Sequence, residues 1–260
     1  MGIDLDGAVV IIDEAHNIED VCRSAGSFEW SQDDVYAIEM EIRTNLARAA
    51  EDPTGVVVLE AQAHQALQHV CTTVLNWMNG VSNFGPSSTT ATNKHQSFET
   101  KIDIYEGQDI INELMKLGIN PNTVEMWAGH LQSIEEASRK LMSQKMQQDG
   151  GSKSAIEEKV LSSGACRILT GFFFTLQNIF EDSNAKIAAF RLVKYSTFKM
   201  SNTKRDNRFF YLLLYIVKNE KREVIEMGFW CLSSDVIFKP IASQARAVIL
   251  TSGTLSPVLI

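Results

Sequence analysis

A run of five apolar residues that ends in two adjacent carboxylates constrains this chain more than any other feature. The run spans residues 8–12 and leads into Asp13, Glu14, an alanine and His16. An unbroken apolar stretch of this length is typical of a strand that is buried on both faces, as in the parallel sheet of an α/β domain. The direction of the chain then places both acids at the carboxyl end of the strand, where open α/β sheets bind their ligands.

Two acids at such an edge predict a site for a cation or a reacting water. The chemistry that suits them is nucleotide hydrolysis, in which Asp13 would hold Mg²⁺ through its water shell. Glu14 would orient or deprotonate the water that attacks the γ-phosphate. The alternative is that one of the two acids only caps the next helix, because carboxylates are favoured near helix N-termini.

A second buried strand is predicted near the other end of the sequence. Residues 247–251 form an apolar run, and a hydroxyl-rich turn with Ser252, Gly253 and Thr254 follows it. Hydroxyl groups at the end of an adjacent strand can hydrogen-bond to a carboxylate or a histidine. The two strand ends are therefore expected to lie side by side.

The composition indicates a soluble intracellular protein with a sizeable core. The chain has 260 residues, 45% of them hydrophobic, which suffices for one large or two small domains. Its net charge of −8 gives no global basic field, so any DNA contact would come from local patches. No apolar stretch reaches the length of a membrane span, and residues 1–12 lack the features of a signal peptide.

The cysteines stand far apart and show no paired spacing of the kind that metal ligands have. We expect free thiols that are mostly buried as small apolar residues. They are Cys22, Cys71, Cys166 and Cys231.

Helical periodicity and capping signals predict a mainly helical middle section. Gly26 is expected to end the first helix in a left-handed conformation, and the segment from Ser31 to Asp34 resembles a capping box. Residues 82–98 are polar and of low complexity, which predicts a flexible loop. The predicted helices span 17–25, 31–51, 56–78, 108–117, 122–146, 155–181 and 235–245.

The pattern changes after residue 190. Two strand-like runs, 209–217 and 224–232, flank a connection at 218–223 that suits a hairpin. A long helical insertion therefore splits one α/β sheet. The predicted parts are 1–30 (first part of the sheet domain), 31–188 (helical insertion) and 189–260 (return to the sheet domain).

Several residues of the insertion have a structural explanation that we prefer to a functional one. His64 and His69 are five residues apart, so they do not share a helix face and are expected on its surface. The aromatic run 172–174 could stack bases, but no basic residues interleave with it, which favours core packing. A solvated face is expected for Glu135, Glu136, Lys140 and Lys145.

The order of these elements resembles the XPD-like iron–sulfur DNA helicases of superfamily 2. The shared features are the Asp-Glu-Ala-His tetrad at 13–16, the long insertion, and the Thr-Ser-Gly-Thr-Leu-Ser-Pro segment at 251–257. Within the family, residues 13–20, 117–119 and 229–232 resemble the Fanconi anaemia group J type. The resemblance implies a partial RecA-like α/β sheet of the P-loop NTPase class, interrupted by a large α-helical insertion of the arch type.

The resemblance also implies an ATP-dependent 5′→3′ DNA helicase that acts in DNA repair, in the nucleus, on single-stranded or forked DNA. Asp13 would bind Mg²⁺ through water, and Glu14 would activate the water that attacks ATP. His16 would link the nucleotide site to residues 252–254, the motif that couples hydrolysis to DNA movement.

The sequence departs from the family pattern in several places. It contains no G-x-x-x-x-G-K-[ST] loop to bind the phosphates. The cysteines of the family's 4Fe–4S cluster lie upstream of the tetrad, and its second RecA-like domain follows the segment at 251–257. We therefore expect a fragment that is inactive alone, with the missing helicase domains or DNA-repair proteins as partners.

The alternative is a non-catalytic module in which the helical insertion binds DNA or a partner protein. Basic residues near the second half of the chain are the candidate contacts, although a solvated charged edge also explains them. They are Lys199, Lys204, Arg205, Arg208, Lys218, Lys221 and Arg222.

Overall fold

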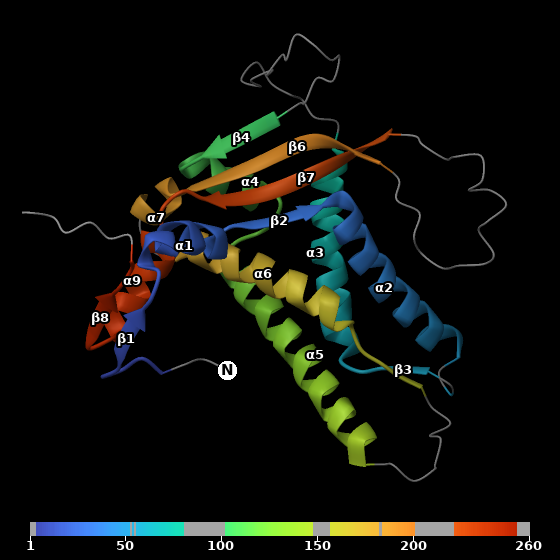
Figure 1. Cartoon of the computed structure of the whole chain (residues 1–260). Helices are drawn as coiled ribbons and strands as arrows, with labels where there is room; N and C mark the ends of the chain where they lie inside the picture. The colour runs from blue at the N-terminus through green and yellow to red at the C-terminus, as the bar shows by residue number, and fades with distance from the viewer. Residues whose placement is uncertain are drawn as a thin grey trace, which may run out of the picture.

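The computed structural model describes residues 4–52, 54, 56–80, 102–147, 157–181, 184–200 and 221–253. This part of the chain is a mixed α/β structure with small sheets and long helices (Figure 1). The strands are β1 (Val9–Ile12), β2 (Phe28–Ser31), β3 (Val56–Val58), β4 (Ile102–Glu106), β5 (Glu157–Lys159), β6 (Phe190–Met200), β7 (Lys221–Cys231) and β8 (Ala247–Leu250). The helices are η1 (Ala15–Asn17, 3₁₀), α1 (Ile18–Gly26), α2 (Gln32–Glu51), α3 (Ala61–Asn79), α4 (Gln108–Lys116), α5 (Pro121–Gln147), α6 (Ser163–Phe180), α7 (Asn184–Ala188) and α9 (Asp235–Gln244).

The described strands form three separate sheets. Strands β1 and β8 pair in parallel, although more than two hundred residues of sequence separate them. An antiparallel sheet has the order β2-β7-β6-β4, and a short parallel pair joins β3 to β5. A split α/β sheet with a largely helical insertion was predicted, and this arrangement is consistent with it.

The core lies where the helices pack beneath the four-stranded sheet. In Figure 1, α6 crosses under β2 and β7, with α3 and α5 beyond it. Phe172 of α6 is fully buried, and its ring lies 4.5 Å from Trp30 and 6.2 Å from Phe229, centroid to centroid. The aromatic run of α6 therefore packs in the core, as predicted, although Phe174 is 46% exposed.

Helix α2 begins with the predicted capping box. The Ser31 hydroxyl accepts from the backbone N–H of Asp34, and the Asp34 carboxylate accepts from the backbone N–H of Ser31. The helix ends at Glu51, just before the expected break at Asp52 and Pro53.

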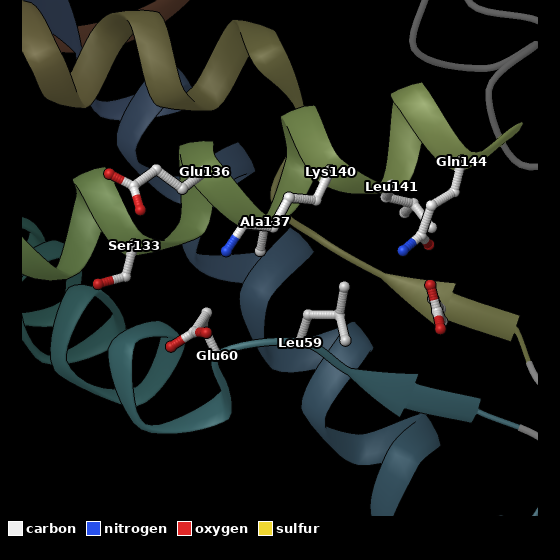
Figure 2. Close-up of a pocket in the computed structure, with 9 residues that line it drawn as sticks. Leu59, Glu60, Ser133, Glu136, Ala137, Lys140, Leu141 and Gln144 are labelled. Carbon is white, nitrogen blue, oxygen red and sulfur yellow. The ribbon is translucent and has the colours of Figure 1, made fainter. Parts of the chain in front are cut away.

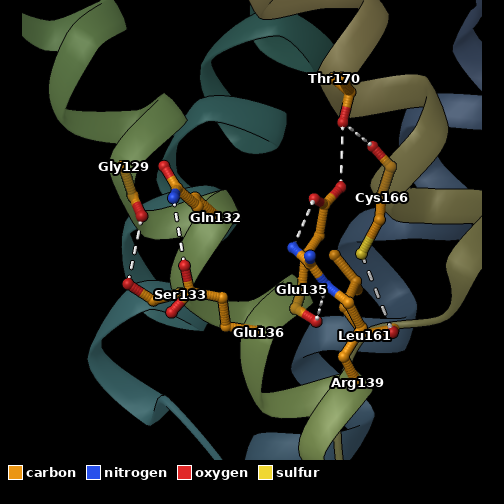
Figure 3. Close-up of polar contacts among 9 residues, drawn as sticks. All are labelled: Gly129, Gln132, Ser133, Glu135, Glu136, Arg139, Leu161, Cys166 and Thr170. Atoms are coloured by element: carbon orange, nitrogen blue, oxygen red, sulfur yellow. Dashed lines mark hydrogen bonds and ion pairs between the residues drawn. The ribbon is translucent and has the colours of Figure 1, made fainter. Parts of the chain in front are cut away.

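Helices α5 and α6 are joined by a polar contact as well as by apolar packing. The Thr170 hydroxyl donates to Oε1 of Glu135 at 3.2 Å, and the Glu135 backbone carbonyl accepts from Nε of Arg139 at 3.3 Å (Figure 3). The side chain of Glu135 is 37% exposed, as expected for a solvated face, and a neighbouring helix supplies one of its partners.

Two predicted helices begin with strands. The segment 56–78 opens with three consecutive valines that form β3, and α3 starts only at Ala61. The segment 155–181 opens with β5, and α6 starts at Ser163. The two short strands pair with each other, and local periodicity cannot reveal a pairing between distant segments. Valine also prefers the extended conformation.

The sheet that covers the core was also incompletely predicted. Strands β2, β4 and β6 were not predicted. Strand β7 starts at Lys221, inside the predicted connection 218–223, and pairs along its whole length with β6. Residues 82–98 and 209–217 lie outside the described residues. Strands β6 and β7 thus belong to a different sheet from β8, and the boundaries at residues 30 and 188 stay a prediction.

The prediction that residues 8–12 are buried on both faces is wrong. Val9 is 51% exposed and Ile11 is 68% exposed, and Ile249 of β8 is 46% exposed. Val10 and Ile12 are half-buried, so the described residues partly cover one face of the β1–β8 pair and leave the other exposed. An apolar run indicates a strand, but its burial depends on the elements that pack on its two faces.

Gly26 does not end α1 in a left-handed conformation. It is the last residue of the helix and has no positive φ. A Cβ atom at this position would lie 2.9 Å from Sγ of Cys231, so glycine is required here by close packing against β7.

His64 is fully buried, whereas His69 is exposed as expected. Helix α3 packs against both α2 and α5, so the face that carries His64 is not a surface. Nδ1 of His64 lies 3.0 Å from the carbonyl oxygen of Glu60, which can only accept, so Nδ1 carries the proton. Nε2 has no hydrogen-bond partner among the described residues. Burial lowers the pKa of His64 below the ordinary histidine value.

All four cysteines are free and buried, as predicted. Among the described residues, no helix combines the length and the apolar character that a bilayer crossing needs.

Replacement of Phe172 by alanine should lower the free energy of unfolding by about 3–5 kcal/mol, because it leaves a cavity between β2, β7 and α6. The matched control is Phe174→Ala on the same helix, at an exposed position, which should cost less than about 1 kcal/mol. Urea unfolding followed by circular dichroism measures both. Equal losses would contradict the placement of the core.

The buried neutral His64 should make the fold less stable in mild acid. Since its pKa is lowered in the folded state, the unfolded chain binds more protons, and stability falls as the pH drops below about 6.5. His64→Gln should reduce this loss between about pH 7 and pH 5, whereas His69→Gln should leave it unchanged. Urea unfolding at each pH tests this, and identical pH profiles for wild type and His64→Gln would refute it.

Candidate functional site

The two carboxylates stand on a one-residue bulge at the end of β1. Thr251 donates its backbone N–H to the carbonyl of Ile12 at 2.9 Å and accepts from the N–H of Ala15, also at 2.9 Å. A regular parallel ladder would use the N–H one residue earlier, at Glu14, so the tetrad contains one extra residue. The bulge moves Asp13 and Glu14 out of the ladder, and both side chains are exposed.

Glu14 adopts a left-handed backbone conformation with φ 52° and ψ 42°. A residue with a Cβ atom is disfavoured there by about 1–2 kcal/mol, and such conformations cluster at functional sites. The hydrogen bonds of Thr251 on both sides of the bulge hold this conformation in place.

Asp13 is fixed by two donors. Its Oδ1 accepts from the Thr251 hydroxyl at 2.8 Å and from the backbone N–H of Glu14 at 2.9 Å. The hydroxyl of Thr251 and the backbone N–H lower the pKa of Asp13, because both hydrogen bonds favour the charged form. Asp13 is therefore an ionised carboxylate at neutral pH.

Glu14, His16 and Ser252 form a second polar cluster beside Asp13. The Ser252 hydroxyl lies 3.3 Å from Oε2 of Glu14 and 2.9 Å from Nδ1 of His16. Nδ1 of His16 is also 3.1 Å from Oε2 of Glu14. An ionised carboxylate can only accept, so this approach requires the proton on Nδ1.

The structure therefore brings together most of the predicted site residues. Asp13, Glu14 and His16 meet Ser252 across the two strand ends, and Gly253 is exposed next to them. Thr254 lies outside the described residues, as do Lys204, Arg205, Arg208 and Lys218. The backbones of Lys199, Lys221 and Arg222 lie in β6 and β7.

Sequence reasoning missed Thr251. It was counted as the last residue of the second strand, yet its hydroxyl contacts Asp13 and its backbone closes the bulge. The available signal was its position, because it is the hydroxyl residue directly opposite Asp13 if the two strands pair in register from Val9 with Ala247.

A hollow lies away from this edge, between α5 and the start of α3 (Figure 2). It holds about 370 Å³, and α5 lines it with Ser133, Glu136 and Lys140, while Leu59 and Glu60 line it from the other side. Its described lining mixes acids with a single lysine, and no group of donors converges on one point. The strand-end cluster is therefore the candidate site.

Comparison with known proteins agrees with the geometry of this edge. The family model DEAD_2 matches residues 1–35, which contain β1, the tetrad and α1. The chain is 28% identical over 263 aligned residues to the Fanconi anemia group J protein homolog of Gallus gallus. The chain is related to the XPD-like helicases. The alignment covers 99% of this chain but 19% of that relative.

A second relative shares a shorter segment. The chain is 47% identical over 57 residues to regulator of telomere elongation helicase 1 of Bos taurus, which is 19% of this chain and 5% of that protein. The chain thus spans about a fifth or less of the length of these relatives.

An iron–sulfur cluster does not fit the cysteines of this chain. They are buried on α1, α3, α6 and β7, and no group of three potential metal-ligating side chains occurs among the described residues.

Removal of the Thr251 hydroxyl should raise the pKa of Asp13 toward the ordinary aspartate value, because the carboxylate loses its strongest donor. Thr251→Val tests this, and Thr251→Ser, which keeps a hydroxyl, is the control. Carboxyl-carbon NMR titration measures the pKa in each variant. An unchanged pKa in Thr251→Val would show that the contact does not hold Asp13.

Proposed function

We propose that the strand-end cluster is the nucleotide-hydrolysing edge of an ATP-dependent DNA helicase motor. The observation that carries the proposal is the meeting of two strand ends from opposite ends of the chain. Thr251 contacts Asp13 there, and Ser252 contacts both Glu14 and His16. Nucleotide-binding α/β proteins bind their ligands at this edge of a sheet.

The residues present fit Mg²⁺ with ATP. Oδ1 of Asp13 is occupied by two donors, and Oδ2 has no hydrogen-bond partner among the described residues. Mg²⁺ prefers oxygen ligands and usually keeps several waters, so one exposed, ionised carboxylate suits it. When bound, Mg–ATP supplies a phosphoryl group that is open to attack by water.

Glu14 is the proposed general base. Its carboxylate is exposed next to Asp13, and the left-handed backbone at this residue directs it away from the ladder. It would accept a proton from the attacking water, while Ser252 and Nδ1 of His16 hold Oε2 in place.

His16 and Ser252 are the proposed link between the nucleotide site and the rest of the motor. Their contact joins residues 236 positions apart in the sequence. A change of charge at Glu14 would alter this contact and so reach the segment after β8. Gly253 and Thr254 are included in this coupling motif by their resemblance to the helicase family.

The finer aspects of this function are proposals from the same resemblance. They are 5′→3′ translocation on single-stranded or forked DNA, a role in DNA repair, and action in the nucleus with further helicase domains or repair proteins as partners. One of the two relatives named above carries the word helicase in its name, which supports the proposal.

The proposal predicts the ATPase activity of a chimeric protein that contains this chain. In a chimera, this chain replaces the matching segment of the chicken Fanconi anemia group J protein homolog. DNA-dependent ATP hydrolysis should persist, and Glu14→Gln should lower its turnover number by about 100-fold or more, because the general base is lost. Steady-state phosphate release measures both.

The matched control is Glu19→Gln, which changes an exposed carboxylate on α1 and should leave turnover within about twofold. Circular dichroism verifies that each chimera is folded. A folded chimera without ATP hydrolysis, or a Glu14→Gln chimera as active as its parent, would contradict the proposed site. The 260-residue chain alone should show no turnover above background, since its sequence has no phosphate-binding loop.

A further inference from the structure

Strand β4 is an edge strand whose outer side carries unused backbone groups. It is the last strand in the order β2-β7-β6-β4 and pairs with β6 from Ile102 opposite Tyr195 to Glu106 opposite Arg191. In an antiparallel pair, only alternate residues direct their N–H and C=O groups at the partner. Apart from this ladder, residues 102–106 make no backbone hydrogen bond to the described part of the chain. The outward groups are a template for another strand.

A groove runs beside this edge, between β4 and α4. It holds about 770 Å³, and Ile104 and Tyr105 line it from the strand. Asp109, Asn112 and Met115 are among the residues that line it from the helix. Ile104 is 47% exposed and Met115 is 52% exposed, so each side of the groove presents a large apolar side chain to solvent.

The floor of the groove is held in place by the core. Tyr105 packs near Trp77, with ring centroids 6.4 Å apart, and Nε1 of Trp77 donates to Oε1 of Glu113 at 2.9 Å. The buried Lys194 of β6 donates to the carbonyl of Trp77 at 3.0 Å. A preformed groove loses little conformational entropy when a ligand binds.

The charge of the groove is acidic. Lys116 is the basic residue of the lining, and its Nζ is 2.9 Å from Oε2 of Glu113. Asp109 is exposed and makes no ion pair with the described residues. The net charge of the lining therefore disfavours a phosphate backbone and favours a basic residue.

We propose that this groove binds an extended peptide segment of a partner protein, which adds a strand to the free edge of β4. The peptide backbone pairs with the outward groups of residues 102–106. Apolar side chains at alternate positions contact Ile104 and Met115, and a lysine or arginine contacts Asp109. This is the strand-addition mode of peptide recognition, in which backbone hydrogen bonds give affinity and alternate side chains give specificity. The proposal does not depend on the nucleotide site.

The test selects peptides of about twelve random residues from a display library, with the 260-residue chain as bait. Selected sequences should alternate apolar residues and carry lysine or arginine. For the best peptide, Ile104→Lys and Asp109→Lys should each raise the Kd by about tenfold or more. Methylation of alternate peptide amides should have a similar effect, because it removes backbone donors. Hydrogen exchange of residues 102–106 should slow when the peptide binds.

The matched control is Met126→Lys, which changes an apolar side chain of α5 that is 49% exposed and lies outside the lining of the groove. It should leave the Kd within about twofold, and thermal melting verifies that all three variants are folded. Selection that works equally well on the Ile104→Lys bait, enrichment of acidic peptides, or no enrichment overturns the proposal. Binding of single-stranded DNA that Ile104→Lys abolishes would assign the groove to nucleic acid and overturn it as well.

Discussion

The pairing of β2 with β7 holds together the two parts of the chain that build the candidate site. Phe28 lies opposite Phe229, and the backbone N–H of Cys231 donates to the Ser27 hydroxyl at 2.9 Å. The cost of closing a loop grows only with the logarithm of its length, and closing the insertion at β2 and β7 also brings β1 and β8 near each other. Once β2 and β7 meet, two short segments lead from there to the site, and the contact of Gly26 with Cys231 and of α1 with α9 aligns them.

Local signals were sufficient wherever one segment determines its own structure. The capping box at Ser31, the long helix α5 and the buried face of α6 follow from nearby residues and were predicted. Pairings between distant segments were not. The valines of β3 form a strand because Glu157–Lys159 lies beside them, and His64 is buried because two other helices pack on α3. The predicted burial of β1 failed for the same reason, since the elements that pack on the faces of a strand cannot be read from the strand itself.

The same distinction between local signals and distant pairings applies to the candidate site. The residue types and their position at a strand end were visible in the sequence, because a carboxylate pair and a hydroxyl-rich turn each follow an apolar run. The bulge was not visible, since it depends on which backbone N–H pairs with Thr251. The left-handed Glu14 and the role of Thr251 follow from the bulge, so both were missed.

The residues of the candidate site and those of the core therefore contribute differently to the stability of the fold. Asp13, Glu14 and His16 are exposed, and hydrogen bonds between exposed side chains add little to stability because water competes for the same groups. These hydrogen bonds orient the side chains of the site. Thr251 orients Asp13, and Ser252 orients Glu14 and His16. Substitutions in this cluster are thus expected to alter the electrostatics of the candidate site. The pairing of β2 with β7, which keeps the two strand ends together, is stabilised by the buried aromatic contacts of Phe172 with Trp30 and Phe229.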